Sequence, residues 1–123
     1  IIPVNEIVDL SINISIATDD GTKGHTGPIT DLLEEYVRKN DQTVNQLSIF
    51  TCGPVPMLKR VTDIALDRQI GCQVSLESAM ACGLGACQGC AIKASPRRER
   101  TFYHVCKDGP VFSAEAVDWN LIC

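Results

Sequence analysis

The sequence predicts an α/β protein in two parts, a parallel sheet with helical crossovers in residues 1–77 and a small β-rich module in residues 78–123. Between residues 11 and 77, segments in which apolar residues recur at every second position alternate with segments in which they recur at every third or fourth position. This alternation indicates the order β-α-β-α-β. At residue 78 a Gly-rich segment with three cysteines begins. Short strand-like segments separated by turn residues then follow.

The first expected strand covers residues 11–18, where Ile12, Ile14 and Ile16 alternate with polar residues. It ends in DDGTKGHTG, whose glycines and aspartates favour a loop. An amphipathic helix is expected over residues 28–40, with Pro28 in its first turn. The apolar positions that define its inner face are Ile29, Leu32, Leu33, Tyr36 and Val37.

The second and third strands are expected at residues 47–53 and 72–77, on either side of a second helix over residues 54–69. The apolar positions that define the inner face of that helix are Met57, Leu58, Val61, Ile64 and Ala65. Strands that alternate with helices in this way form parallel sheets, because each helix carries the chain back across the sheet.

The C-terminal part reads as strands and turns. Residues 91–94 and 101–105 bracket a charged turn and predict a hairpin. The turn contains Arg97, Arg98 and Arg100, which we expect to form a solvated tip, with subunit docking as the alternative. KDGPVF predicts a turn and a last strand, and Ser113 is expected to cap a final helical turn over residues 115–119.

Composition excludes several classes of function. The net charge of −4 is spread along the chain, which argues against a nucleic-acid binder with a basic face. No apolar run reaches the roughly 20 residues of a membrane span. The chain has seven cysteines, an odd number in uneven spacing, which fits a secreted disulfide scaffold poorly. We therefore expect a cytoplasmic protein in which the clustered cysteines serve a metal or redox role.

The cysteine spacing carries the strongest chemical signal. Cys82, Cys87 and Cys90 follow the pattern C-x4-C-x2-C, and Cys106 lies further along the chain. This is the plant-type pattern for a [2Fe–2S] cluster, in which small residues let one loop wrap closely around the metal. A zinc site and a disulfide set remain the alternatives. Cys72 and Cys123 have no clustered partners and are expected to be inert thiols.

A second motif, TCGPVPM, lies where a strand meets a helix. Gly53 permits close approach of a ligand, and the following helix N-terminus offers free N–H groups. A plain structural turn is the alternative.

With both motifs, the chain resembles the electron-transfer subunit of class B dihydroorotate dehydrogenase, a member of the ferredoxin reductase superfamily. The segments that carry the resemblance are ATDDGTKGHTGPITDLL, TCGPVPMLKRV, SLESAMACGLGACQGCAIK and HVCKDGPVFSAEAVDW. The resemblance implies part of a Rossmann-like pyridine-nucleotide domain in residues 1–77 and a [2Fe–2S] domain in residues 78–123. In that family electrons pass between FMN on a catalytic partner subunit, the cluster, FAD and NAD.

The resemblance also implies roles for particular residues. Cys52, Gly53 and Pro54 would lie near the nicotinamide and the flavin. Asp19 and Asp20 stand where NADP-using relatives place residues that bind the 2′-phosphate, so carboxylates there favour NAD; a plain polar turn is the alternative. The family's flavin-binding barrel precedes this region and is not in the sequence. We therefore expect the chain alone not to hold FAD or to be active, and to self-associate through an uncovered sheet edge.

Two rival functions stay open. One is the reductase subunit of an NAD(P)H-linked sulfite reductase, a hydrogenase or a ferredoxin–NADP reductase. The other is a zinc-binding interaction module.

Overall fold

The structure is a computed structural model and describes residues 12–122. It has a mixed α/β fold with small sheets, and the chain divides into two compact units, Ile1–Tyr36 and Val37–Cys123. In the first unit, β1 (Ala17–Thr18) pairs in parallel with β2 (His25–Thr26). The N–H of His25 donates to the carbonyl of Ile16 at 2.8 Å, which closes the loop between the two strands.

The predicted first strand over residues 11–18 is wrong in length. Only Ala17–Thr18 is strand, residues 12–16 have no regular structure, and residue 11 lies outside the described residues. The side chains of Ile12 and Ile14 are 52% and 39% exposed. Alternation of isoleucines could not produce a longer strand here, because β1 pairs only with the two residues of β2 in the described part of the chain.

Helix α1 (Ile29–Lys39) forms where it was predicted, with Asp31 in its first turn and Arg38 and Lys39 in its last. These charges suit the helix dipole at each end. Its predicted inner face is largely uncovered: Val37 is 2% exposed, whereas Ile29 and Tyr36 are 40% and 55% exposed. A 3-10 helix, η3 (Asp41–Gln46), then leads into the sheet of the second unit.

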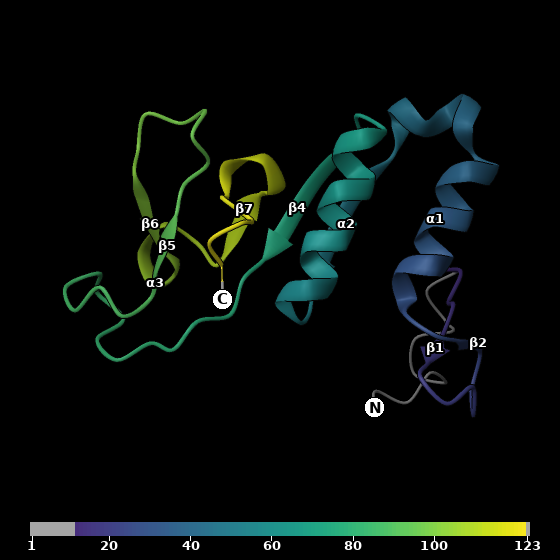
Figure 1. The fold of residues 1–123 in the computed structure, drawn as a ribbon, viewed down its shortest axis with the longest axis horizontal. Coiled ribbons are helices and arrows are strands. Elements are labelled where there is room, and N and C mark those ends of the chain that lie inside the picture. The colour runs from purple at the N-terminus through teal and green to yellow at the C-terminus, as the bar shows by residue number, and fades with distance from the viewer. Residues whose placement is uncertain (1–11, 123) are drawn as a thin grey trace. The chain divides into compact units, whose positions relative to one another are not determined.

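The core of the second unit is built on α2 (Val55–Asp67), which lies between β3 (Ser48–Cys52) and β4 (Gly71–Ser75) in the chain. β3 and β4 pair in parallel, in register from Ser48 with Gly71 to Cys52 with Ser75. Figure 1 shows α2 lying along β4. The predicted inner face of the helix is confirmed for four of its members, the buried side chains of Leu58, Val61, Ile64 and Ala65.

Helix α2 ends in a turn that is normally made with glycine. The N–H of Ile70 donates to the carbonyl of Ala65 at 2.8 Å, and that of Gln69 donates to Leu66 at 3.2 Å. These two bonds define a Schellman motif, in which the residue after the cap takes a left-handed conformation. Gln69 does so with φ 56°. The turn directs the chain into β4 at a conformational cost that glycine would avoid.

The sheet of the second unit is mixed rather than wholly parallel. The last strand, β7 (Val111–Ser113), pairs antiparallel with β4, in the order β3-β4-β7. The N–H of Leu76 also donates to the carbonyl of Pro110 at 3.0 Å. The predicted single parallel sheet is therefore not what the described residues form. The boundary at residue 77 stays a prediction, with β7 contributed from beyond it.

The predicted hairpin is present as β5 (Ala91–Lys93) and β6 (Phe102–His104), paired antiparallel. A short helix, α3 (Val105–Asp108), follows β6, and a 3-10 turn, η4 (Ala114–Ala116), follows β7. The predicted capping role of Ser113 is wrong, because its side chain makes no cap hydrogen bond. At its other end, the turn is held by the N–H of Ser95, which donates to the carbonyl of Ala116 at 2.8 Å.

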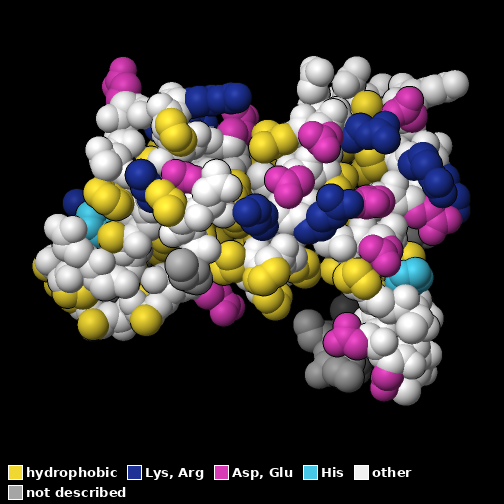
Figure 2. Space-filling view, viewed as in Figure 1, with side chains coloured by type: hydrophobic (Ala, Val, Ile, Leu, Met, Phe, Trp, Pro, Cys, Tyr) yellow, Lys and Arg dark blue, Asp and Glu magenta, His cyan; other side chains and the backbone are white. Residues whose placement is uncertain are grey.

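Within residues 12–122, no helix combines the length and the apolar character needed to cross a membrane. On the face shown in Figure 2, acidic and basic side chains are interspersed rather than gathered into one basic patch.

Candidate metal centre

The three-cysteine loop runs between β4 and β5 without helix or strand, and Figure 1 shows it as a long excursion away from the sheet. Its tight curvature depends on left-handed backbone at Gly83 (φ 67°), Gly85 (φ 76°) and Gln88 (φ 61°). Glycine adopts this conformation without cost, whereas a residue with a side chain is strained there. The expectation that the loop's glycines supply positive φ is confirmed for two of them, and Gln88 was not foreseen.

The Cys82 sulfur is surrounded by hydrogen-bond donors from its own loop. The N–H groups of Leu84 and Cys87 both point to the Cys82 Sγ, each with a nitrogen–sulfur distance of 3.4 Å. The Cys87 N–H makes the largest contribution to lowering the pKa of Cys82, to about 6, and Leu84 N–H follows. Donors of this kind stabilise a thiolate, which is the form of cysteine that binds metals.

Cys90 and Cys106 form a second sulfur pair. Their Sγ atoms are 3.2 Å apart, and Cys90 is buried at the start of β5 while Cys106 lies in α3. The backbone N–H of Cys106, and then its thiol, lowers the pKa of Cys90. The pKa of Cys106 is raised, first by its hydrogen bond to Cys90 and then by burial. The two thiols of this pair therefore interact directly with each other.

The arrangement of the four sulfurs fits a two-iron cluster. Two thiolates on one tetrahedral metal, each about 2.3 Å from it, lie roughly 3.8 Å apart. The Cys90–Cys106 separation of 3.2 Å is shorter than that value, so the two sulfurs would have to move apart to share a metal ion. The thiol of Cys87 in turn interacts with Cys82. In the [2Fe–2S] pattern four cysteines serve two irons, so two sulfur pairs are what the cluster requires.

Two further observations concern the alternatives. All six cysteines that the structure describes are free thiols, so no disulfide joins any of them. Within residues 12–122, no group of three or more His, Cys, Asp or Glu side chains is arranged to hold a single metal ion. Cys72 is buried, and burial raises its thiol pKa, as suits an inert core thiol. The Cys123 side chain lies outside the described residues.

Asp108, which the sequence analysis did not single out, follows Cys106 by two residues in α3. Asp108 accepts a hydrogen bond from the N–H of His104 at 2.8 Å and an ion pair from Arg100 at 2.9 Å. The His104 N–H and then Arg100 lower the pKa of Asp108. No sequence motif marks this contact, because it joins the carboxylate to a backbone N–H within the turn around Cys106. His104 Nε2 is buried with no hydrogen-bond partner among the described residues.

The CGP motif ends β3 and starts α2. Cys52 is exposed at the end of the strand, and the Pro54 carbonyl accepts from the N–H of Leu58 at 3.0 Å. A Cβ on Gly53 would lie 2.5 Å from Met57 Cε, at the flexible end of that side chain, which could move away. The φ of 155° is a conformation that residues with a side chain rarely adopt, so glycine at this position also has a conformational reason.

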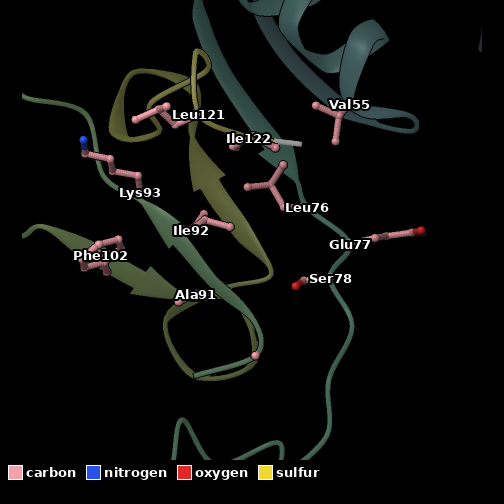
Figure 3. A pocket seen from close by; sticks show the side chains of 11 residues that line it. Val55, Leu76, Glu77, Ser78, Ala91, Ile92, Lys93, Phe102, Leu121 and Ile122 are labelled. Atoms are coloured by element: carbon pink, nitrogen blue, oxygen red, sulfur yellow. The ribbon is translucent and has the colours of Figure 1, made fainter. Parts of the chain in front are cut away.

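A cavity of about 500 Å³ is lined mainly by the segment that follows β4, the β5–β6 hairpin and residues 121–122. Figure 3 shows Val55 at the start of α2 on one side and Ile92, Lys93 and Phe102 of the hairpin on the other. Gly89, which directly precedes Cys90, also lines it. Each of the two motifs thus contributes one residue to the wall, and the predicted site residues themselves do not line the cavity.

Asp19 and Asp20 lie in the exposed turn after β1. The Asp20 Oδ1 accepts from the N–H of Thr22 at 3.0 Å and from its hydroxyl at 2.8 Å. The Thr22 backbone N–H and then its hydroxyl lower the pKa of Asp20, so its carboxylate stays ionised. Asp19 is exposed beside it. This geometry is compatible both with a polar turn and with a ribose contact.

Comparison with known proteins gives a consistent family. Residues 77–118 match the family described as the iron–sulfur cluster binding domain of dihydroorotate dehydrogenase B. Over 85% of its length the chain is 40% identical to the dihydroorotate dehydrogenase B (NAD(+)) electron transfer subunit of Caldanaerobacter subterraneus. It is 41% identical over 83% of its length to that subunit of Bacillus pumilus. The chain spans 40% and 36% of the lengths of these two relatives.

A solved structure gives the same fold. The NADH-dependent reduced ferredoxin-NADP oxidoreductase, studied for flavin-based electron bifurcation, matches 97% of this chain with a TM-score of 0.70 and 30% sequence identity. The match covers 40% of that protein's chain.

Proposed function

Because residues 77–118 belong to the iron–sulfur cluster binding domain family of dihydroorotate dehydrogenase B, and the whole chain is related to that enzyme's electron transfer subunits, we propose that it is an electron-transfer module holding one [2Fe–2S] cluster. The proposed ligands are Cys82, Cys87, Cys90 and Cys106. The observation that carries the proposal is the division of these thiols into two pairs.

The chain's own residues prepare the site for such a cluster. The N–H groups of Leu84 and Cys87 stabilise negative charge on the Cys82 sulfur, and the Cys106 N–H does so for Cys90. Fixed donors of this kind are the second-shell contacts that tune a metal centre. When bound, a [2Fe–2S] cluster takes up and releases one electron at a time. No general acid or base is therefore required of this chain.

In the intact protein we propose that electrons pass between this cluster, FAD, NAD and an FMN-containing dihydroorotate dehydrogenase catalytic subunit, in pyrimidine biosynthesis. Cys52, Gly53 and Pro54 are proposed to lie against the redox-active rings, supported by their place between the end of β3 and the N-terminus of α2, where backbone N–H groups are free to bind a ligand. Asp19 and Asp20 are proposed to select NAD over NADP. The fold is proposed to be the partial Rossmann-like nucleotide domain of the ferredoxin reductase superfamily.

Serine replacement tests the ligand assignment. Each of the six described cysteines is changed to Ser in turn, and iron, zinc and acid-labile sulfide are measured per chain after anaerobic reconstitution. We expect loss of the cluster in the Cys82, Cys87, Cys90 and Cys106 variants and full loading in the Cys52 and Cys72 variants. The assignment is wrong if Cys72→Ser abolishes loading while Cys82→Ser does not. Zinc in place of iron and sulfide would instead favour the zinc-binding interaction module.

A second candidate function is favoured by the structural match at 30% identity, which is a ferredoxin–NADP oxidoreductase. The two candidates differ in the partner that exchanges electrons with the module. The intact protein is mixed either with a dihydroorotate dehydrogenase catalytic subunit or with reduced ferredoxin, and nicotinamide reduction is followed. Dihydroorotate-dependent reduction of NAD supports the first candidate, whereas ferredoxin-dependent reduction alone supports the second.

A further inference from the structure

We propose that Asp108 is a positioning residue for the cluster: its carboxylate ties together the two ends of the turn that carries Cys106 and so holds the Cys106 thiolate beside Cys90. This inference rests on the proposed cluster function and deepens it. Asp108 itself touches neither sulfur in the structure. Its effect would be exerted through the backbone of residues 104–108.

The two carboxylate oxygens of Asp108 have separate tasks. Oδ2 accepts a hydrogen bond from the backbone N–H of His104, four residues earlier, at 2.8 Å. This bond joins the two ends of residues 104–108, and Cys106 lies between them in the sequence. Oδ1 accepts from Arg100 Nη1 at 2.9 Å, which ties the same turn to the loop before β6. The Asp108 side chain is only 19% exposed, whereas that of Arg100 is 60% exposed. Both contacts are charge-assisted hydrogen bonds, and the backbone contact is the better shielded of the two.

The turn that Asp108 closes is in contact with the cysteine loop. The N–H of Val105 donates to the carbonyl of Cys90 at 3.1 Å, and the Val105 side chain is fully buried. A Cβ placed on Gly85 would lie 3.3 Å from Lys107 Cδ and 3.9 Å from His104 Cγ. The residues on both sides of Cys106 thus rest against the loop that holds the other ligands. Orientation of this turn accordingly sets where the Cys106 sulfur lies relative to Cys90.

Arg100 is itself held in place by aromatic side chains. Its guanidinium lies 5.7 Å from the centre of the Tyr103 ring, and that ring packs at 5.4 Å against Phe112 of β7. The Asp108 carboxylate is therefore connected through Arg100 and two aromatic rings to the sheet. An isolated exposed ion pair would contribute little. Here the pair links the Cys106 turn to the buried part of the unit.

The test compares Asp108→Ala with Asp108→Asn in the intact cluster-loaded protein. We measure the rate of cluster loss to a chelator under anaerobic conditions and the electron paramagnetic resonance spectrum of the reduced cluster. Loss of a second-shell partner typically weakens metal binding by about tenfold or more, so Asp108→Ala should release its cluster about tenfold faster and show shifted g values. Asp108→Asn keeps an oxygen for the His104 N–H, so it should restore most of the native spectrum.

Arg100→Ala and Arg97→Ala form a charge-matched pair. Both remove one arginine from the same loop, but Arg97 forms no ion pair among the described residues. Arg100→Ala should accelerate cluster loss in the same direction as Asp108→Ala does, and Arg97→Ala should behave as the wild type. A merely structural role would lower thermal stability but leave the spectrum of the loaded fraction unchanged.

The outcomes separate the two proposals. If the wild-type protein binds no iron and sulfide, the proposed function fails and this inference fails with it. If the wild type binds the cluster and the Asp108→Ala protein matches it in spectrum and in rate of loss, only the inference is overturned. Should Asp108→Ala not fold, Arg100→Ala decides, and a wild-type spectrum with a wild-type rate of cluster loss in that variant overturns the inference.

Discussion

Cys82 should behave as an unusually acidic thiol whenever the metal site is empty. Two backbone N–H groups at 3.4 Å lower its pKa from 9.0 to about 6. The experiment treats the reduced, metal-free protein with iodoacetamide at a series of pH values. The alkylation rate of Cys82 should follow the thiolate fraction, with a midpoint near pH 6 and a plateau at higher pH.

The expected magnitude combines two opposed effects. At pH 6 about half of Cys82 is thiolate, against about 0.1% of a thiol with the ordinary pKa of 9.0, an advantage of roughly 500-fold. Nucleophilicity falls with pKa, and a Brønsted coefficient of about 0.4–0.5 over this shift costs roughly 20-fold. Cys82 should therefore react about 25-fold faster than a free thiol at pH 6 and about tenfold slower at pH 9.

Peptide mass spectrometry of the quenched samples measures each cysteine separately, with a free cysteine derivative in the same tube as the reference. Cys72 serves as the internal control, because it is 8% exposed and should remain unlabelled. A Cys82 rate that climbs with a midpoint near pH 9, without crossing that of the reference, would refute the reasoning. The same shift implies that ionised Cys82 stabilises the folded loop fully above pH 9 and that this contribution fades as the pH falls to about 6.

Three further predictions concern other parts of the chain. Gln69→Gly should stabilise the protein by about 0.5–1 kcal/mol, because glycine adopts the φ of 56° without strain; urea unfolding measures it, and an unchanged midpoint would contradict it. Leu58→Ala should destabilise it by about 2–5 kcal/mol, since Leu58 is 1% exposed in the core, and a loss below about 1 kcal/mol would count against that packing. Asp20→Arg in the intact protein should erode a preference for NADH over NADPH of roughly tenfold to a hundredfold in kcat/KM, and equal use of both by the wild type would rule out the proposed role of Asp20.

Prediction from sequence succeeded where local pattern and packing agree. The periodicity of α2 gave both its extent and its buried face, because that helix covers the sheet formed by β3 and β4. The hairpin of β5 and β6 was predicted from turn residues between two short apolar segments. The cysteine spacing indicated four candidate ligands, and two of them, Cys90 and Cys106, are brought within 3.2 Å by pairing of that hairpin.

The misses have physical causes that a single sequence does not display. The alternation of Ile12, Ile14 and Ile16 indicates strand propensity, but a strand also needs a partner, and β2 offers only two residues. The pairing of β7 with β4 is a non-local contact between segments that no periodicity connects. Asp108 was missed because its importance arises from the fold of the turn around Cys106 rather than from a motif.

The antiparallel pairing of β4 with β7 has a consequence for synthesis of the protein on the ribosome. β4 ends at Ser75 and its partner does not begin until Val111, so the cysteine loop and the hairpin are made in between. At typical translation rates of about 5–20 residues per second, that interval lasts roughly 2–7 s. Throughout it one edge of β4 lacks its neighbour, and from Cys90 onward three of the four proposed ligand cysteines already exist. The nascent chain therefore presents thiols before it can close its sheet, and Cys106 joins them shortly before β7 is made.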